Sequence, residues 1–176
     1  MAFIKSIEVE EATGKVAEIF QTMNDKMGFI PGSFKMFGLS EHVLGQQVNN
    51  IRYFSVNTRF SGKLLAFIRL MVSEEERCEY CVDVNTGILF QYGILPEQVT
   101  EILKDHTKVP LEENEKALLF FVLKVVKNSK EVSKGDIDNL INLGWTDADI
   151  LEASYHGASQ VGMDKLFNAF QVHVEG

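Results

Sequence analysis

The only two cysteines of the 176-residue chain stand three residues apart, at Cys78 and Cys81 in the stretch RCEYCVDVN. If this stretch is helical, both side chains lie on one face, about 5 Å apart, which is a separation that suits a disulfide. A thiol in the first turn of a helix also lies at the positive end of the helix dipole, which favours the thiolate. The spacing therefore predicts a reversible dithiol.

Three other interpretations of the cysteine pair are weaker. A structural zinc site needs two more thiolate or imidazole ligands, but the chain has no second cysteine pair and its four histidines are scattered: His42, His106, His156 and His173. Two cysteines placed by chance in a core would rarely show this spacing. A thioredoxin-like protein also uses C-x-x-C, yet it needs a βαβ setting that this chain does not offer. We therefore expect no metal.

The charges around the pair oppose ionisation of a thiol. Acidic residues precede and follow it, at Glu74, Glu75, Glu76, Glu79 and Asp83. Like-signed neighbours disfavour a thiolate, so activation must come from the helix dipole, from Arg77, or from a base elsewhere in the fold. A run of glutamates is otherwise typical of a solvated turn.

Composition excludes several function classes. The formal net charge of −8 argues against a nucleic-acid partner, which needs concentrated Lys and Arg. No apolar stretch reaches the roughly 18 residues of a membrane span, and we see no secretory signal. No nucleotide, flavin or haem motif occurs, so no cofactor is expected. We expect a cytoplasmic protein, and in that reducing compartment a close cysteine pair is more often catalytic, redox-sensing or metal-binding than a structural disulfide.

Helical periodicity dominates the sequence and predicts an all-α fold. The pattern indicates helices over about 10–26 and 40–54, after a cap at Ser61, from near Cys78 to Tyr92, and from Pro96. Later helices follow Leu111 and the capping sequences that begin at Ser133 and Thr146. We expect one helical domain over residues 1–176, with a weak indication of two similar halves, about 1–93 and 94–176.

The last helix, from about Asp147, has apolar residues on two sides. One stripe of small residues comprises Ile150, Ser154, Gly157, Ala158 and Val161, and a second comprises Met163, Leu166, Phe167, Phe170 and Val174. A helix with two such stripes can serve its own core and a neighbouring subunit, which predicts a homo-oligomer. The alternative is a kink at Gly162 that keeps both stripes in one core.

At the cysteine stretch the sequence resembles the carboxymuconolactone decarboxylase and alkylhydroperoxidase (AhpD-like) superfamily. The resemblance extends to GKLLAFIRLMVSEEERCEYC, PGSFKMFGLSEHVL, EKALLFFVLKVV and LGWTDADILEA, and so covers about residues 28–170. It implies a compact multi-helix AhpD-like fold assembled as a trimer or hexamer.

In the peroxidase branch, the resemblance implies that Cys81 reacts with a small hydroperoxide to give a sulfenic acid. Cys78 would then resolve it as a disulfide, and a dithiol reductant protein would reduce the pair. A second thiol beside a sulfenic acid traps it before over-oxidation. The resemblance thus implies a peroxidase or peroxiredoxin-type oxidoreductase with an antioxidant role.

The sequence departs from the family at two positions of its proton relay. The family usually has a histidine four residues after the second cysteine, where this chain has Asn85. It also has a glutamate twelve residues before the first cysteine, where this chain has Ala66. Asparagine can orient a water or hold a thiol, but it does not take a proton. The dithiol is kept while both relay groups are missing.

Other residues could support the pair. Glu74 lies one turn before Cys78, and His156 lies on an otherwise apolar line, as a base aimed at the cysteines or, as we prefer, as a histidine satisfied by nearby polar groups. Tyr80 could donate a hydrogen bond to a peroxide oxygen, although packing is its more ordinary role. Asn85 is the fourth supporting candidate.

Two alternatives to a peroxidase stay open. The family's lactone decarboxylase branch is a lyase that does not depend on a C-x-x-C pair. The third possibility is a non-enzymatic, redox-sensing oligomer that keeps a reversible disulfide without peroxide turnover.

Overall fold

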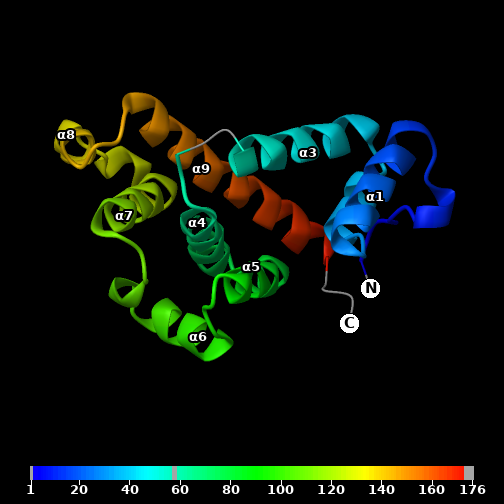
Figure 1. Cartoon of the computed structure of the whole chain (residues 1–176), viewed down its shortest axis with the longest axis horizontal. Coiled ribbons are helices and arrows are strands. Elements are labelled where there is room, and N and C mark those ends of the chain that lie inside the picture. The colour runs from blue at the N-terminus through cyan, green and yellow to red at the C-terminus, as the bar shows by residue number, and fades with distance from the viewer. Residues whose placement is uncertain (1, 57–58, 173–176) are drawn as a thin grey trace. The chain divides into compact units, whose positions relative to one another are not determined.

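The protein is known from a computed structural model that describes residues 2–56 and 59–172. All regular elements in these ranges are helical, which confirms the predicted all-α class (Figure 1). The elements are η1 Val9–Glu11, α1 Gly14–Met27, α2 Gly32–Phe37, α3 Glu41–Val56, α4 Gly62–Glu75, α5 Glu79–Gln91, α6 Pro96–Lys104, η2 His106–Lys108, α7 Glu113–Asn128, η3 Ser129–Glu131, α8 Lys134–Asn142 and α9 Asp147–Phe170.

Local capping explains where several helices begin. The side chain of Ser61 accepts a hydrogen bond from the Leu64 amide, 3.0 Å away, and so caps α4 as predicted. Ser133 and Asp136 form a reciprocal capping box at α8. Thr146 and Asp149 exchange the same kind of bonds at the start of α9. The predicted capping sequences are therefore confirmed.

The first helix differs from the prediction at its start. It was expected from about Glu10, but α1 begins at Gly14, and the short η1 helix precedes it. The backbone is extended at Thr13 and left-handed at Gly14, with a φ of 55°, so the chain changes direction between the two elements. A left-handed φ is readily adopted by glycine because it has no Cβ.

The chain divides into two compact units, one comprising residues 1–58 and 167–176 and the other residues 59–166. In the described part of the first unit, α1, α2 and α3 enclose an apolar core that includes Phe20 and Leu44. The rings of Phe37 and Phe167 lie 5.6 Å apart, centroid to centroid, in the same core. The assignment of one domain, or of halves meeting near Gly93, stays a prediction.

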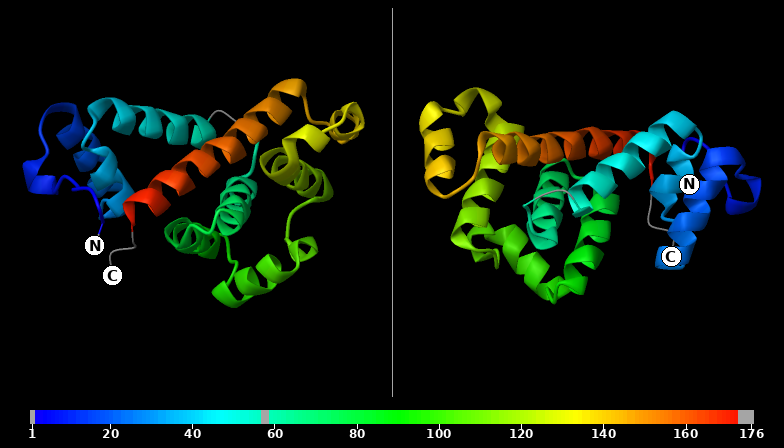
Figure 2. Two further views of the ribbon diagram at one scale, coloured as in Figure 1. Left: turned by 180° about the vertical axis from the view of Figure 1, so that it is seen from behind. Right: turned by 45° about the horizontal axis from the view of Figure 1, so that its top comes forward.

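Helix α4 is the centre of the second unit. It packs against α5 and α7, and both views from front and behind show it between these two helices (Figure 1, Figure 2). Nine consecutive or near-consecutive residues of α4 are buried, as the nearly continuous apolar sequence predicts: Leu64, Leu65, Ala66, Phe67, Ile68, Leu70, Met71, Val72 and Ser73. Burial on most sides gives α4 a fixed position from which to present polar groups.

Helix α9 approaches α4 and α7 closely at one glycine. A Cβ built on Gly157 would lie only 2.4 Å from a methyl carbon of Val122 in α7 and 3.5 Å from one of Ile68 in α4. Such a contact leaves no room for a methyl group, so the glycine permits the helix approach. The close approach places polar side chains of α9 beside those of α4.

The two faces of α9 differ from the predicted stripes. Within residues 147–166, the buried residues include Ala153, His156, Gly157, Gln160 and Asp164, while Leu151, Tyr155, Ala158, Gly162 and Leu166 are exposed. Val174, which the second predicted stripe included, lies outside the described residues. None of the described helices is both long enough and apolar enough to cross a membrane.

Candidate active site

The turn between α4 and α5 positions the first cysteine. Arg77 has a left-handed backbone, with a φ of 55°, which is uncommon for a residue with a side chain. The backbone amide of Cys78 then donates a hydrogen bond to the Ser73 carbonyl, 2.9 Å away. Cys78 becomes the N-cap residue of α5, and Cys81 lies in the first turn. The predicted placement of the pair at a helix start is confirmed.

Both cysteines are free thiols and both are buried, with exposed fractions of 1% for Cys78 and 4% for Cys81. Their sulfurs and a carboxylate oxygen of Asp164 all lie within 4.8 Å of one another. Asp164 comes from α9, and its side chain has no exposed surface. Two thiols and one carboxyl group, all shielded from solvent, therefore meet at one point.

The carboxylate of Asp164 is held through one oxygen only. Oδ1 accepts hydrogen bonds from the Ser73 hydroxyl at 2.9 Å and from the Gln160 amide at 2.8 Å. Oδ2 is buried and has no hydrogen-bond partner within the described ranges. A buried carboxylate oxygen without a donor is unfavourable, and such a group is often functional. Oδ2 is therefore the carboxylate oxygen that is free to exchange a proton.

A polar seam joins α4 to α9, and we define it by Arg69, Ser73, His156, Gln160 and Asp164. Arg69 and Ser73 are one turn apart on α4, and the other three recur at four-residue intervals on α9. An Arg69 guanidinium nitrogen lies 3.2 Å from Nε2 of His156, and Ser73 bonds to Asp164 one turn further along. The seam brings the α9 carboxyl group to the start of α5.

Asn85 connects this seam to the second cysteine. Its Oδ1 accepts a hydrogen bond from Nε of Arg69 at 2.8 Å, and its Nδ2 donates to the Cys81 carbonyl at 2.8 Å. Asn85 is 3% exposed. Asn85 therefore holds Arg69 and the first turn of α5 in place, and its side chain does not ionise.

The two thiols influence each other's ionisation. Their mutual hydrogen bond lowers the pKa of Cys78 below its usual value, although burial opposes this shift. The same hydrogen bond, together with burial, raises the pKa of Cys81. Cys81 thus keeps its proton and donates it toward the Cys78 sulfur. These directions favour Cys78 as the first thiolate, whereas the family resemblance gives the attacking role to Cys81.

Burial dominates the ionisation of the seam residues. It raises the pKa of Asp164 above the ordinary carboxyl value, and contacts with Cys81, Gln160 and Ser73 offset only part of this. Burial, with a contribution from the Arg69 charge, lowers the pKa of His156 to about 3. Burial also lowers the pKa of Arg69, to about 10, so this side chain is still a cation at neutral pH.

The structure places the supporting residues proposed from the sequence in different environments. His156 is neutral, and it receives a hydrogen bond from Arg69 at Nε2 while its ring also bonds to the Leu65 backbone. A guanidinium only donates, so this nitrogen is already occupied as an acceptor. Glu74 is exposed at the end of α4, and Tyr80 is 7% exposed in the first turn of α5. Ala66 is fully buried and offers no proton-carrying group.

Three site residues were missed from the sequence: Arg69, Ser73 and Asp164. The signal that could have found Asp164 is the recurrence of polar residues at His156, Gln160 and Asp164, each four residues apart on a helix with apolar neighbours. Residues at this spacing share a helix face, so a single buried member predicts that the others are near the same neighbour. Ser73 had no comparable signal.

The three donor atoms also have the spacing of a metal site, and their chemistry tests that reading. Two sulfurs and one carboxylate supply three ligands, one fewer than a closed structural zinc site requires. In residues 2–56 and 59–172, no fourth Cys, His, Asp or Glu joins the group. The cluster therefore lacks the fourth protein ligand of a closed structural zinc site.

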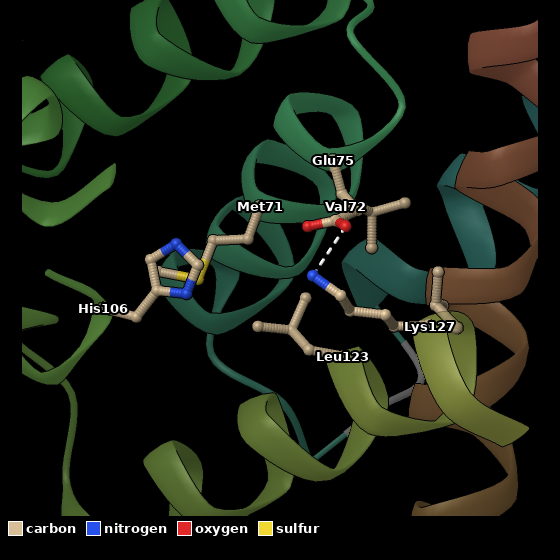
Figure 3. A pocket seen from close by; sticks show the side chains of 7 residues that line it. Met71, Val72, Glu75, His106, Leu123 and Lys127 are labelled. Atoms are coloured by element: carbon tan, nitrogen blue, oxygen red, sulfur yellow. Dashed lines mark ion pairs between the residues drawn. The ribbon is translucent and has the colours of Figure 1, made fainter. Parts of the chain in front are cut away.

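A small pocket of about 110 Å³ lies elsewhere in the second unit (Figure 3). Figure 3 shows Met71, Val72 and Glu75 on α4, with Leu123 and Lys127 of α7 across the pocket. Glu75 and Lys127 form an ion pair at 2.7 Å. The volume is well below the several hundred Å³ of ordinary ligand sites, and neither cysteine lines it. We assign it no role in the chemistry.

Comparison with known proteins identifies the fold. No family model and no curated protein matches the sequence. Solved structures do match. An uncharacterized peroxidase-related protein from Silicibacter sp. TM1040 has a TM-score of 0.88 and 16% identity, covering 99% of this chain and 92% of its own. The alkylhydroperoxidase AhpD core protein of Ralstonia eutropha JMP134, also peroxidase-related and uncharacterized, has a TM-score of 0.86 and 20% identity, with coverages of 99% and 92%.

A third match shows that this architecture is used for other chemistry. The debrominase Bmp8, as a cysteine-to-alanine variant in complex with 2,3,4-tribromopyrrole, has a TM-score of 0.78 and 15% identity, covering 100% of this chain and 95% of its own. The chain therefore has the AhpD-like fold of these peroxidase-related proteins. The resemblance found in the sequence is confirmed at the level of the fold.

Proposed function

We propose that this protein is a thiol-dependent, peroxide-reducing oxidoreductase in which Cys78 and Cys81 alternate between dithiol and disulfide. The observation that carries the proposal is the meeting of two buried free thiols at the start of α5, with sulfurs within 4.8 Å. A modest approach of the two sulfurs closes the bond, because residues at i and i+3 have Cα atoms near disulfide distance. The fold of the peroxidase-related neighbours agrees with this function.

The proposed cycle balances atoms and electrons. One thiolate attacks the terminal oxygen of a hydroperoxide ROOH, which forms an S–O bond, breaks the O–O bond and gives a sulfenic acid with the alkoxide RO⁻. The proton that left the attacking thiol converts the alkoxide to ROH. The second thiol then loses its proton as its sulfur attacks the sulfenic sulfur and forms the S–S bond, and the expelled hydroxide takes that proton and leaves as water. An external dithiol, for which we propose a dithiol reductant protein, reduces the disulfide and is itself oxidised.

The electrostatics support this chemistry in two ways. The hydrogen bond between the thiols lowers the pKa of Cys78, so a nucleophilic thiolate is available. The neighbouring sulfur keeps its proton and is close enough to resolve a sulfenic acid before further oxidation. A cytoplasmic setting with dithiol reductants would keep the pair reduced between turnovers.

The first experiment follows the two thiols of reduced protein by intact mass after one equivalent of an organic hydroperoxide. The proposal expects loss of two mass units, and no added oxygen, faster than for a free-thiol peptide with the same C-x-x-C sequence. The variants Cys78→Ser and Cys81→Ser should lose turnover with a dithiol reductant, and the Cys81→Ser protein should retain one added oxygen on Cys78 because no resolving thiol is left. Conversion no faster than the peptide would refute the proposal.

The same protein samples separate the alternatives. Lactone decarboxylation by the double serine variant would instead establish the lyase branch. Oxidation that changes thermal stability or assembly while peroxide consumption stays at background would indicate the redox-sensing oligomer. Release of bromide from a brominated pyrrole would point to the chemistry named for the Bmp8 neighbour.

A further inference from the structure

We infer that Asp164 is the proton acceptor of the dithiol: its Oδ2 takes the proton that leaves Cys78 and later returns it to the departing alkoxide. This assigns to a residue of α9 the task that the family gives to the glutamate and histidine replaced here by Ala66 and Asn85. The second half of the statement, return to an alkoxide, rests on the proposed peroxide chemistry. The first half stands without it.

Geometry is the main support for this role. Asp164 has no exposed surface, a carboxylate oxygen lies within 4.8 Å of both sulfurs, and Oδ2 has no hydrogen-bond donor in the described ranges. Oδ1 is fixed by Ser73 and Gln160, which leaves the orientation of the free oxygen determined. A candidate general base must lie close to the proton that it removes, and the Asp164 carboxyl group lies beside both thiols, whose contacts with it affect its ionisation.

The other supporting candidates do not meet this condition for a general base. Nε2 of His156 is occupied by the Arg69 guanidinium, and the amide of Asn85 has no basic atom. Glu74 is exposed at the end of α4, and Glu75 is paired with Lys127. In the described part of the chain, Asp164 is the carboxyl group that shares a buried cluster with the two thiols.

The groups that face Asp164 also suit proton exchange. From α5 it meets Cys78 and Cys81, from α4 the neutral hydroxyl of Ser73, and from its own helix the neutral amide of Gln160. Burial raises the pKa of Asp164 toward that of a thiol, while the pKa of Cys78 is lowered. Proton transfer between two groups is easiest when their pKa values approach each other.

The proton steps complete the cycle. Asp164 takes the proton of Cys78, which leaves a thiolate that the Cys81 thiol stabilises. After attack on the hydroperoxide, the protonated Asp164 gives this proton to RO⁻ and forms ROH. The regenerated carboxylate then takes the proton of Cys81 as this sulfur attacks the sulfenic acid, and returns it to the leaving hydroxide as water. No proton is left over.

The test measures Cys78 reactivity against pH without peroxide. Reduced protein is treated with iodoacetamide, in a buffer that contains a metal chelator, between pH 4.5 and 9.5, and modification of Cys78 is followed by peptide mass. Rates must be proportional to reagent concentration, which shows that opening of the buried site is fast. The wild-type chain is compared with Asp164→Asn and with Asp149→Asn, a matched control that removes a buried aspartate at the other end of α9.

A base and a mere neighbouring charge predict opposite results for Asp164→Asn. If Asp164 accepts the proton, the alkylation rate of wild-type Cys78 rises at acidic pH as the carboxyl group ionises. This rise is the acidic limb of the profile. The rate is then constant through neutral pH. The variant then reacts roughly tenfold or more slowly at pH 7, and its rate climbs until the thiol itself ionises. If Asp164 only repels a thiolate, the variant reacts faster at pH 7, and this overturns the inference. An unchanged profile overturns it as well.

A second variant keeps the test decisive if Asp164→Asn does not fold. Ser73→Ala removes one donor to Oδ1 but keeps the carboxyl group, so the pKa of Asp164 should rise further and the acidic limb should move to higher pH, with the same plateau. If the Ser73→Ala protein is folded and the acidic limb of its pH–rate profile stays at the wild-type pH, the inference is contradicted. If the alkylation profiles agree but hydroperoxides are not reduced, the proposed function fails and the role of Asp164 stands.

Discussion

Nε of Arg69 donates a hydrogen bond to Oδ1 of Asn85 at 2.8 Å, and this pair occupies the position where the family resemblance places a histidine. The asparagine cannot relay a proton, but its side-chain oxygen accepts a hydrogen bond from the buried Arg69 cation. Its other end holds the Cys81 carbonyl. Asn85 and Arg69 therefore act as one hydrogen-bonded arrangement that also holds the first turn of α5.

Replacing Asn85 with alanine should destabilise the protein by about 1–3 kcal/mol, because it leaves the Arg69 Nε donor without its acceptor in a buried place. Urea unfolding measures this difference in the free energy of unfolding. Asn49→Ala, at an exposed position of α3, is the matched control and should change stability by less than about 0.5 kcal/mol. Equal effects in the two variants would contradict the structural role of Asn85.

His156 should make the fold sensitive to acid. Its pKa is lowered to about 3 in the folded protein, against about 6.5 in an unfolded chain. Between these values the unfolded state binds a proton that the folded state does not, so stability is present above pH 6.5 and is lost as the pH falls toward 3. The slope is about 1.4 kcal/mol per pH unit.

The variant His156→Gln tests this linkage, because glutamine does not titrate. Unfolding free energies between pH 6 and pH 4 should show a pH slope smaller by about one proton than in the wild-type chain. His106→Gln, a histidine at the pocket of Figure 3 and outside the seam, serves as control and should keep the wild-type slope. The prediction fails if His156→Gln has the same slope as well.

Gly157 and Gly87 should respond oppositely to the same substitution. Gly157→Ala forces a Cβ to within 2.4 Å of Val122 and should destabilise the protein by roughly 1–3 kcal/mol through overpacking. Gly87 lies inside α5 with nothing within 4 Å of an added Cβ, so Gly87→Ala should stabilise by about 0.5–1 kcal/mol. Thermal melts of the two variants, at one protein concentration, decide whether α9 approaches α7 as closely as described.

The exposed apolar face of α9 predicts assembly into a homo-oligomer, with a trimer or hexamer expected from the family resemblance. Leu151, Tyr155 and Leu166 are 70%, 56% and 38% exposed on this face. Tyr155→Glu should therefore lower the molar mass measured by sedimentation, because a charge is placed on the contact. Met27→Glu, at an exposed position of α1, should leave it unchanged. A wild-type chain that sediments as a monomer would refute the prediction.

The sequence predicted the features that depend on residues close together in the chain, namely the helix caps and the cysteine pair. Ser61, Ser133 and Thr146 cap the helices they were expected to cap, because the bonds involved join residues three apart. The cysteine pair was likewise visible as a C-x-x-C motif at a helix start. For these features, sequence distance and spatial distance are nearly the same.

The rest of the site depends on contacts that span the chain. The Ser73–Asp164 bond joins residues 91 positions apart, and Arg69 meets His156 across 87. No periodicity in α4 alone shows which turn of α9 will lie beside it, because that is decided by packing at places such as Gly157. The four-residue spacing of His156, Gln160 and Asp164 could have indicated a shared polar face, but the contact of Asp164 with Ser73 and the thiols depends on how the helices pack.

The near-complete burial of the two sulfurs has a kinetic consequence. An oxidant reaches Cys78 only when the start of α5 or a neighbouring segment moves aside, since 1% of this residue is exposed. When that motion is slower than the reaction of an accessible thiolate, consumption of oxidant becomes independent of its concentration. The rate then saturates at the frequency of opening, and bulky oxidants, which need a wider opening, saturate at a lower ceiling than hydrogen peroxide. Rates measured with hydroperoxides of increasing size would thus report how often, and how widely, the start of α5 opens.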